Sequence, residues 1–389
     1  MSGASSSVSA CGIRVAASGR SSTRDAVDEL KGRLGSTDFQ YIVAFFSMEH
    51  DAEVLSAAVA AEFPGVPFSG CSTAGEITPL GMMQGGVLLL AFPHDGFRIH
   101  ADVINNIDQF GVERATETAR RLTSQVSSTS ARPLKDSVFA LMLVDGLSNA
   151  EEAIVAAIHW AIGDIQLIGG SAGDDLVFQR TSLIHNGLIL QRSAILLMIE
   201  SDFPFRVFKT QNFEPTPIKL VVTAADSENR IVHELNAEPA ALEYASAIGL
   251  MPEDLGPFSF ASYPLVVKVG RDYYCRSIRN MNPDHSLSFF CAIDEGLVFT
   301  VARPQDILHS TEDMLEHLNS MLGGIDLVVG FDCILRRLDA ETRQVRHQLD
   351  QLYRKYSVAG FHTYGEQYNA MHLNQTLTGI AFGQRRTES

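Results

Sequence analysis

Cysteine, basic residues and long apolar runs are all scarce in this sequence, and each shortage excludes a class of protein. The five cysteines are scattered and form no C-x-x-C pair, which argues against a disulfide framework and a structural zinc site. Lys and Arg number 30 against 46 Asp and Glu, and the net charge of −16 disfavours nucleic acid and membranes as partners. No apolar run approaches the length of a membrane span, since "GGVLLLAF" stops at Pro93.

The first 36 residues are small, polar and rich in serine. They contain no sustained apolar segment, so we predict a flexible leader at residues 1–36 and no secretory signal. Reduced, unpaired thiols fit a cytoplasmic protein, which is the location we expect. The whole chain of 389 residues is long enough for about two domains.

Three segments repeat one order of elements: a strand, a helix, a second strand that enters a Gly-rich turn, and a further strand. The first has a strand at 41–47, a helix at 51–63 capped by Asp51, and the turn "GCSTAGE". The second has a strand at 137–145, a helix at 149–163 capped by Asn149, and the shorter turn "GGSAGDD". The third consists of "IDLVVGFDC", the helix "ETRQVRHQLDQLYRKY" and the turn "GFHTYGE".

This repetition predicts an α/β fold with two lobes, built from β-α-β-loop-β units whose mixed sheets are covered by helices. The lobe boundary is expected near Pro215–Pro217, because "NFEPTPIKL" is interrupted by proline and extended. Asn186-Gly187 lies between two apolar runs and predicts a hairpin.

The turns are the candidate ligand site. Glycines in a turn after a strand let several backbone N–H groups face one concavity, which can hold an anion or a carbonyl oxygen. The acids that close the turns could bind a ligand's ammonium group or simply cap neighbouring N–H groups, and both interpretations stay open. We predict that the turns converge on one cleft, with these ligand-binding residues: Ser72, Thr73, Glu76, Ser171, Asp174, Thr363, Tyr364 and Glu366.

Motifs of the common nucleotide-binding enzymes are missing. No Gly-Lys-Ser/Thr follows the turns, and no G-x-G-x-x-G follows a strand. Cys71 begins a turn, but no histidine is fixed near it in the sequence, and a buried structural cysteine is the commoner case. We therefore expect a protein that is not an enzyme.

The segments "GCSTAGEITPLG", "IGGSAGDD" and "GFHTYGEQYNAMHLNQTLTGIAF" resemble the signature segments of the FIST family of sensory proteins. The resemblance implies a FIST N-terminal domain at 37–217 and a FIST C-terminal domain at 218–389. Within the family, the chain resembles the NosP group, which binds haem, senses nitric oxide and modulates a histidine kinase in cyclic-di-GMP and biofilm signalling. A sensor without an output segment acts through a partner, and a histidine kinase is the partner that the resemblance implies.

If haem binds, its iron needs an axial ligand, and the resemblance points to His372, His185 or His362. Each of these histidines could equally be a hydrogen-bonded turn or core residue. Candidates for pairing with the propionates are Arg180, Arg276 and Arg279. The alternative is a haem-free sensor of a small polar metabolite such as an amino acid. The oligomeric state stays open, a homodimer included.

Overall fold

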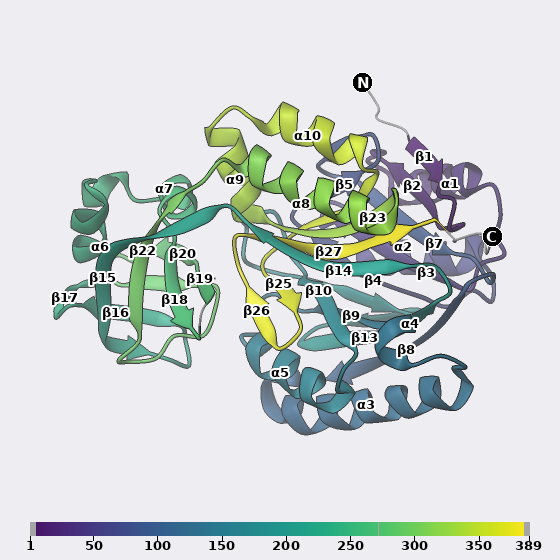
Figure 1. Cartoon of the computed structure of the whole chain (residues 1–389), viewed down its shortest axis with the longest axis horizontal. Helices are drawn as coiled ribbons and strands as arrows, with labels where there is room; N and C mark the ends of the chain where they lie inside the picture. The colour runs from purple at the N-terminus through teal and green to yellow at the C-terminus, as the bar shows by residue number, and fades with distance from the viewer. Residues whose placement is uncertain (1–4, 271, 385–389) are drawn as a thin grey trace.

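The structure is a computed structural model that describes residues 5–270 and 272–384. It has a large body of three mixed sheets and a smaller domain on one side, built on an eight-stranded sheet (Figure 1). Mixed sheets covered by helices confirm the predicted α/β class. None of the helices within the described ranges is long and apolar enough to cross a membrane.

The large body consists of three units with the same order of elements, and the first unit begins near the N-terminus. After the edge strand β1 (Ser5–Val8), this first unit contains β2 (Arg14–Ser18), α1 (Thr23–Leu34), β3 (Tyr41–Ser47), α2 (Ala52–Glu62), β4 (Phe68–Thr73), β5 (Glu76–Thr78), β6 (Gly81–Met83) and β7 (Val87–Phe92). The second contains β8 (Phe97–Asn105), α3 (Ile107–Thr129), α4 (Leu134–Ser137), β9 (Val138–Val144), α5 (Glu151–Ile162), β10 (Gln166–Ser171), β11 (Leu183–His185), β12 (Leu188–Leu190) and β13 (Ser193–Ser201).

The third unit is interrupted by the smaller domain. Its own elements are β14 (Phe205–Gln211), α8 (Ile307–Leu322), β23 (Ile325–Cys333), α9 (Ile334–Thr342), α10 (Arg346–Lys355), β24 (Val358–Thr363), β25 (Glu366–Tyr368), β26 (Met371–Leu373) and β27 (Thr376–Gly383). The inserted domain, residues 213–304, contains β15 (Phe213–Asp226), β16 (Ile231–Leu235), β17 (Glu238–Pro239), α6 (Ala240–Ile248), the 3-10 helix η1 (Pro252–Asp254), α7 (Pro257–Ser262), β18 (Leu265–Val269), β19 (Asp272–Arg276), β20 (Ile278–Met281), β21 (Leu287–Phe289) and β22 (Val298–Pro304).

Each unit gives its hairpin to the sheet of another unit. The hairpin β5–β6 pairs with β24 of the third unit, β25–β26 pairs with β10 of the second, and β11–β12 pairs with β4 of the first. The exchange is therefore cyclic, from the first unit to the third, from the third to the second and from the second to the first. The three Gly-rich turns lie where the chain passes from one sheet to another. Gly75, at φ +115°, occupies a backbone conformation that L side chains rarely adopt, in the first of these crossings.

A glycine on the third strand of each unit (β4, β10 and β24) lets the parallel strands approach closely. Gly70, Gly169 and Gly360 pair with Ala44, Met142 and Gly330 of the neighbouring strand. A Cβ added at these glycines would lie 2.2, 1.9 and 1.8 Å from the carbonyl oxygen of the paired residue. The glycines of the repeated motif are thus required by strand packing.

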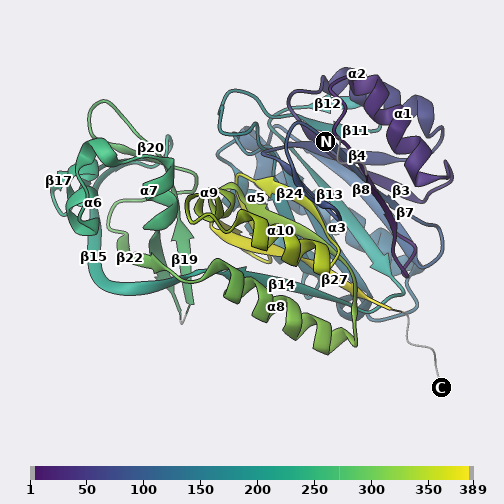
Figure 2. The same ribbon diagram turned by 90° about the horizontal axis from the view of Figure 1, so that it is seen from above.

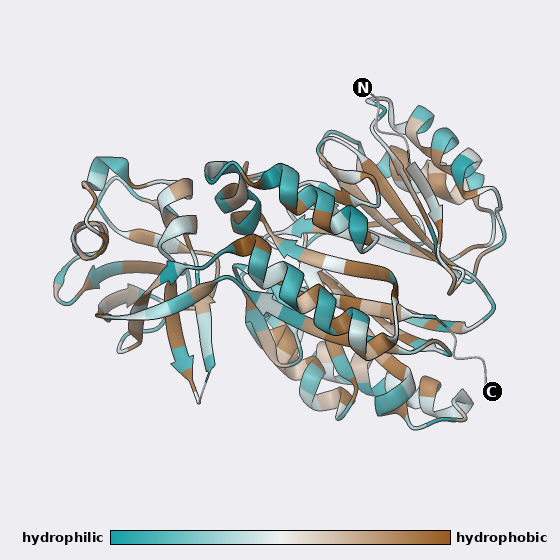
Figure 3. Cartoon of the chain, turned by 45° about the horizontal axis from the view of Figure 1, so that its top comes forward, coloured by the Kyte–Doolittle hydropathy of each residue, from teal (hydrophilic) through white to brown (hydrophobic). Residues whose placement is uncertain are grey.

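The inner faces of the three sheets share one core. Phe45 and Leu88 of the first unit meet Phe139 of the second and Phe331 and Phe361 of the third, with Phe45 and Phe361 ring centres 4.6 Å apart. The outer faces are covered by α1 and α2 (Figure 2), and by α3 and α5 and by α8 and α10 (Figure 1), respectively. The strands are accordingly apolar while the helices are hydrophilic on their outer sides (Figure 3).

Local sequence signals explain some element ends and fail at others. Asp51 caps α2 as predicted, accepting hydrogen bonds from the Glu53 and Val54 N–H groups at 2.9 and 3.0 Å. The predicted Asn149 cap of α5 is wrong: Asn149 has φ +58°, and Ala150 occupies the cap position without a side-chain bond. The single helix expected at 341–356 ends and restarts, because Gln344 takes a left-handed conformation between α9 and α10.

The stretch predicted as a flexible leader differs in the structure, apart from residues 1–4, which lie outside the described residues. It contains β1, β2 and α1, and β2 pairs with β7 of the first sheet. The Ser-rich composition hid a short buried strand, β2, and an amphipathic helix whose Val27 and Leu30 are fully buried. The predicted domain boundary at 217/218 stays a prediction; it falls within β15, at the start of the inserted domain.

Candidate functional site

The three Gly-rich turns lie in contact with one another. The Ala74 N–H donates to the His362 carbonyl at 2.9 Å, and the Gly173 N–H donates to the Ser72 carbonyl at 3.1 Å. The Ser171 N–H donates to the Gly365 carbonyl at 2.8 Å, which completes the links among the three units. The structure thus brings together the turn residues that the sequence singled out, although ligand binding by them stays a prediction.

The acids that close the first and third turns accept hydrogen bonds from residues of their own units. Glu76 accepts hydrogen bonds from the Thr73 hydroxyl at 2.6 Å and from the Gly86 N–H at 3.1 Å. Glu366 accepts from the Thr363 hydroxyl and, at 2.8 Å, from the Thr376 hydroxyl. Burial raises the pKa of both carboxyl groups to about 8, so both are mostly protonated at neutral pH. This arrangement supports a capping role for Glu76 and Glu366.

The second turn differs because Asp174 holds the segment that follows it. Its carboxylate accepts the N–H groups of Phe178, Gln179 and Arg180 at 2.7–3.0 Å, and the Tyr364 hydroxyl donates to it. The same hydroxyl accepts the Leu176 N–H at 2.7 Å. Asp174 and Tyr364 therefore join the second turn to the third. Ser72 performs a similar task in the first unit, since its hydroxyl accepts the Ser182 N–H at 3.1 Å.

The inserted domain packs against this meeting point. Its Phe290 ring lies 5.9 Å from that of Tyr364 and 5.6 Å from that of Phe178. The side-chain amide of Gln375, in the third unit, donates to the Phe260 carbonyl of α7 at 3.2 Å. The turns therefore face a junction between two domains and not open solvent.

A buried ion pair crosses the same junction. Arg230 of the inserted domain donates to Glu151 and Glu152 at the start of α5, at 2.7 and 2.6 Å. Glu152 also accepts the Ala292 N–H at 2.7 Å. Burial raises the pKa of Glu151 to about 7, because the effect of burial exceeds the lowering of the pKa by the Arg230 charge. Arg230 has φ +57°, a strained conformation that places its side chain in this contact.

Polar atoms without partners gather around the third turn. The His372 ring packs against Gly365, so closely that a Cβ added there would lie 2.2 Å from the His372 Cε1 atom. The Gln367 amide donates to His372 Nδ1 at 3.2 Å and to the Gly365 carbonyl at 3.4 Å. Within the described part of the chain, His372 Nε2, Gln367 Oε1 and Asn374 Oδ1 are buried and have no hydrogen-bond partner. Buried polar atoms are rarely left unsatisfied, so a ligand is one explanation for this cluster.

The three histidines predicted as haem ligands occupy three separate environments. His185 is half-buried on β11, with Ser69 Oγ 2.8 Å from Nδ1 and the Asn186 amide 3.1 Å from Nε2. His362 is buried beside Gly75 and Arg337, and its Nδ1 lies 3.8 Å from Asp332. Burial and the Arg337 charge lower the pKa of His362 well below its usual range, and burial lowers that of His372 to about 4.

These environments do not fit haem in the conformation described. An axial ligand must turn a free ring nitrogen toward a pocket as wide as a porphyrin. His362 and His372 have free nitrogens but are only 1% and 2% exposed, among tightly packed neighbours. Both ring nitrogens of His185 are already within hydrogen-bond distance of other side chains. Haem at any of these positions would require a rearrangement.

The three arginines proposed to pair with the haem propionates also lie in different environments. Arg180 is exposed on the segment after the second turn. Arg276 and Arg279 are half-buried in the inserted domain, where they donate to the Cys275 carbonyl and the Asn280 side chain. Among the described residues, no carboxylate lies within salt-bridge distance of Arg276 or Arg279. Arg279 stands over the Phe178 ring at 6.0 Å, and the Arg276 charge contributes to the lowered pKa of His372, so both face the junction.

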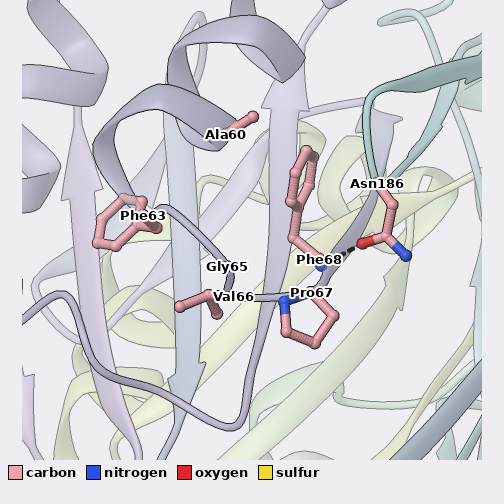
Figure 4. Close-up of a pocket in the computed structure, with 7 residues that line it drawn as sticks. All are labelled: Ala60, Phe63, Gly65, Val66, Pro67, Phe68 and Asn186. Atoms are coloured by element: carbon pink, nitrogen blue, oxygen red, sulfur yellow. Dashed lines mark hydrogen bonds between the residues drawn. The ribbon is translucent and has the colours of Figure 1, made fainter.

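A surface hollow lies away from the turns. It measures about 340 Å³ and lies between the end of α2 and the β11–β12 turn, where Phe63, Phe68 and Asn186 line it (Figure 4). None of the eight predicted turn residues lines it. It is shallow and open to solvent, and we assign it no role.

Several residues of the junction were not predicted from the sequence. Arg230, Glu151 and Glu152 stand far apart in the chain, and no local motif connects them. Gln367 and Asn374 lie in the segment "EQYNAMHLNQT", in which the predicted site residues are Glu366 and His372. The signal that could have found them is the density of amide side chains around His372.

Two family comparisons match adjoining parts of the chain. The FIST N domain family matches residues 40–238, and the FIST C domain family matches residues 240–369. An uncharacterised protein of Methanocaldococcus jannaschii is 22% identical over 287 residues, which are 73% of this chain and 50% of that protein. The chain thus spans about half the length of this curated relative. A chorismatase crystal structure covers 89% of this chain and 94% of its own, at 8% identity and a TM-score of 0.35, a likeness too distant to carry an argument.

Proposed function

We propose, on the premise that this chain belongs to the FIST family, that it is a non-enzymatic sensor which binds a small polar molecule at the junction between the turns and the inserted domain. FIST domains indicate a role in sensing and signal transduction. The observation that carries the proposal is the cluster of unpartnered buried atoms on His372, Gln367 and Asn374. A polar ligand would satisfy these atoms and hold the two domains together.

The narrower prediction of a haem protein of the NosP type, which senses nitric oxide, rests on the resemblance alone. It needs an open histidine, which this conformation does not offer. We therefore favour the haem-free sensor of a metabolite such as an amino acid. A signalling protein such as a histidine kinase is the proposed partner in either case, because binding at a domain junction can change the surface that a partner meets.

Two titrations of the purified full chain separate these proposals. A screen of small polar metabolites by thermal unfolding should find ligands that raise the unfolding temperature. Ferrous haem should give no stoichiometric complex with a Soret band that shifts on nitric oxide addition. A stoichiometric haem spectrum that changes in His372→Ala, His185→Ala or His362→Ala would instead establish the haem sensor.

A further inference from the structure

We infer that the ligand of this junction is a small carboxylate, held between Arg276 and Arg279 of the inserted domain and His372 of the core. The inference rests on the proposed function and specifies its ligand. It names the groups that recognise the ligand on each side, so that the ligand itself bridges the two domains.

The core side offers a hydrogen-bond donor. Because the Gln367 amide donates to Nδ1 of His372, the neutral imidazole carries its proton on Nε2. The Gly365 carbonyl fixes this orientation of the amide, since only the NH₂ end of Gln367 can donate to it. The Nε2–H group is buried and has no acceptor among the described residues. An acceptor oxygen of a ligand would give this N–H group its hydrogen-bond partner.

The inserted domain offers unpaired positive charge. Arg276 and Arg279 are half-buried and have no carboxylate partner in the described ranges, whereas Arg230 beside them is fully paired with Glu151 and Glu152. Strand β19, which ends at Arg276, contacts β26, which carries His372 (Figure 1). The charges of Arg276 and of Glu152, which is paired with Arg230, both act on His372. An arginine and an imidazole N–H at one junction match the oxygens of an anion.

The remaining free atoms favour a carboxylate over phosphate. Gln367 Oε1 and Asn374 Oδ1 are unpartnered acceptors around the same turn, and the Asn374 amide is held by the Tyr364 carbonyl at 3.2 Å. Most oxygens of a phosphate are acceptors and point to every side, so some of them would lie against these two amide oxygens. A carboxylate whose carbon chain also bears an N–H or O–H group presents acceptors to Arg276 and a donor to the amide oxygens.

The connection between the domains permits entry to this closed site. The chain enters the inserted domain along β15 and leaves it along β22, and these two strands pair with each other. Between the pairs Pro215–Ala302 and Lys219–Thr300, residues 216–218 of β15 stand opposite Val301 alone. A bulge of this kind, flanked by Pro215 and Pro217, interrupts the ladder and provides a place to bend. We expect the inserted domain to open at this bulge and to close on the ligand.

The test uses thermal unfolding of the full chain with acetate, glycine, succinate, L-aspartate and inorganic phosphate as probes. We expect at least one carboxylate to stabilise the protein and phosphate to have no effect. Arg276→Gln should raise the half-saturating concentration about tenfold to a hundredfold, because a charge-assisted contact is lost. Arg206→Gln is the matched control, since exposed Arg206 likewise donates only to the carbonyl of the preceding residue. If Arg276→Gln does not fold, Arg276→Lys replaces it, with a smaller loss expected.

The outcomes also distinguish this inference from the proposed function. Stabilisation by phosphate alone, or by a carboxylate with unchanged affinity in Arg276→Gln or Arg276→Lys, overturns the inference but leaves a polar sensor. No stabilisation by these carboxylates, with a hit elsewhere in the wider metabolite screen, also overturns it. No hit in either screen overturns the proposed function itself.

Discussion

Removing Arg230 should weaken the attachment of the inserted domain more than any exposed substitution. Arg230 is 4% exposed, and its guanidinium is bonded to Glu151, Glu152 and the Phe290 carbonyl. In Arg230→Met both carboxylates remain at the junction without a cation. Breaking a buried pair by removing one partner costs about 3–5 kcal/mol, because an uncompensated charge stays behind. We expect a loss of stability in this range at pH 8.

The loss should depend on pH in a definite direction. Burial already raises the folded-state pKa of Glu151 to about 7, and the Arg230 charge opposes this effect at both glutamates. Removal of Arg230 therefore raises both folded-state pKa values further. The penalty is then absent below the unfolded pKa and grows as the pH rises toward the folded values. Arg230→Met should therefore come closer to the wild type at pH 5 than at pH 8.

The assay is urea unfolding followed by far-UV circular dichroism, with amide hydrogen exchange on the start of α5 to detect domain opening. Arg303→Met is the control, because Arg303 forms an exposed ion pair with Glu214 and should lose about 1 kcal/mol or less. If Arg230→Met and Arg303→Met are equally stable at pH 8, and if amide hydrogen exchange at the start of α5 is unchanged, the buried ion pair does not hold the inserted domain in place.

Three further predictions concern the turns. Gly169→Ala should destabilise the fold by about 1–3 kcal/mol or more, since its Cβ would lie 1.9 Å from the Met142 carbonyl oxygen. The control Gly32→Ala, where the added Cβ on helix α1 meets no neighbour, should stabilise the fold slightly. Comparable unfolding midpoints for the two variants would contradict this prediction. Tyr364→Phe should cost about 1–3 kcal/mol by leaving Asp174 and the Leu176 N–H without the hydroxyl, a result that urea unfolding measures and that a neutral outcome would disprove. Burial raises the folded-state pKa of Glu76 to about 8. The free energy of unfolding of the wild type should therefore fall by about 1.4 kcal/mol per pH unit from this group, as the pH rises from the unfolded pKa toward 8. Glu76→Gln should have a flatter dependence of stability on pH, and identical slopes for the two proteins would contradict this prediction.

Local patterns predicted the elements of the three units well. The strands at Tyr41–Ser47 and Ile325–Cys333 coincide with apolar runs, and the hairpin at Asn186-Gly187 is present. These elements depend on periodicity and turn chemistry, which a single sequence contains. The repeated turn also predicted that matching residues would meet, because a repeated unit packs in a repeated way.

The exchange of hairpins and the composition of the junction could not be predicted in this way. Whether β5 pairs within its own unit or with β24 depends on contacts between residues that are hundreds of positions apart in the chain. The Arg230–Glu151 pair likewise forms only after the inserted domain docks. The turn acids show the same limit, since the sequence could not decide whether Glu76 faces a ligand or its own turn.

A crystal structure of the full chain with a stabilising metabolite would show directly where the ligand binds. We expect electron density for the ligand between Arg276 and the His372 Nε2 atom, beside the third turn. Density for the ligand in the hollow at Phe63 and Asn186, or a haem bound to His185, would contradict it.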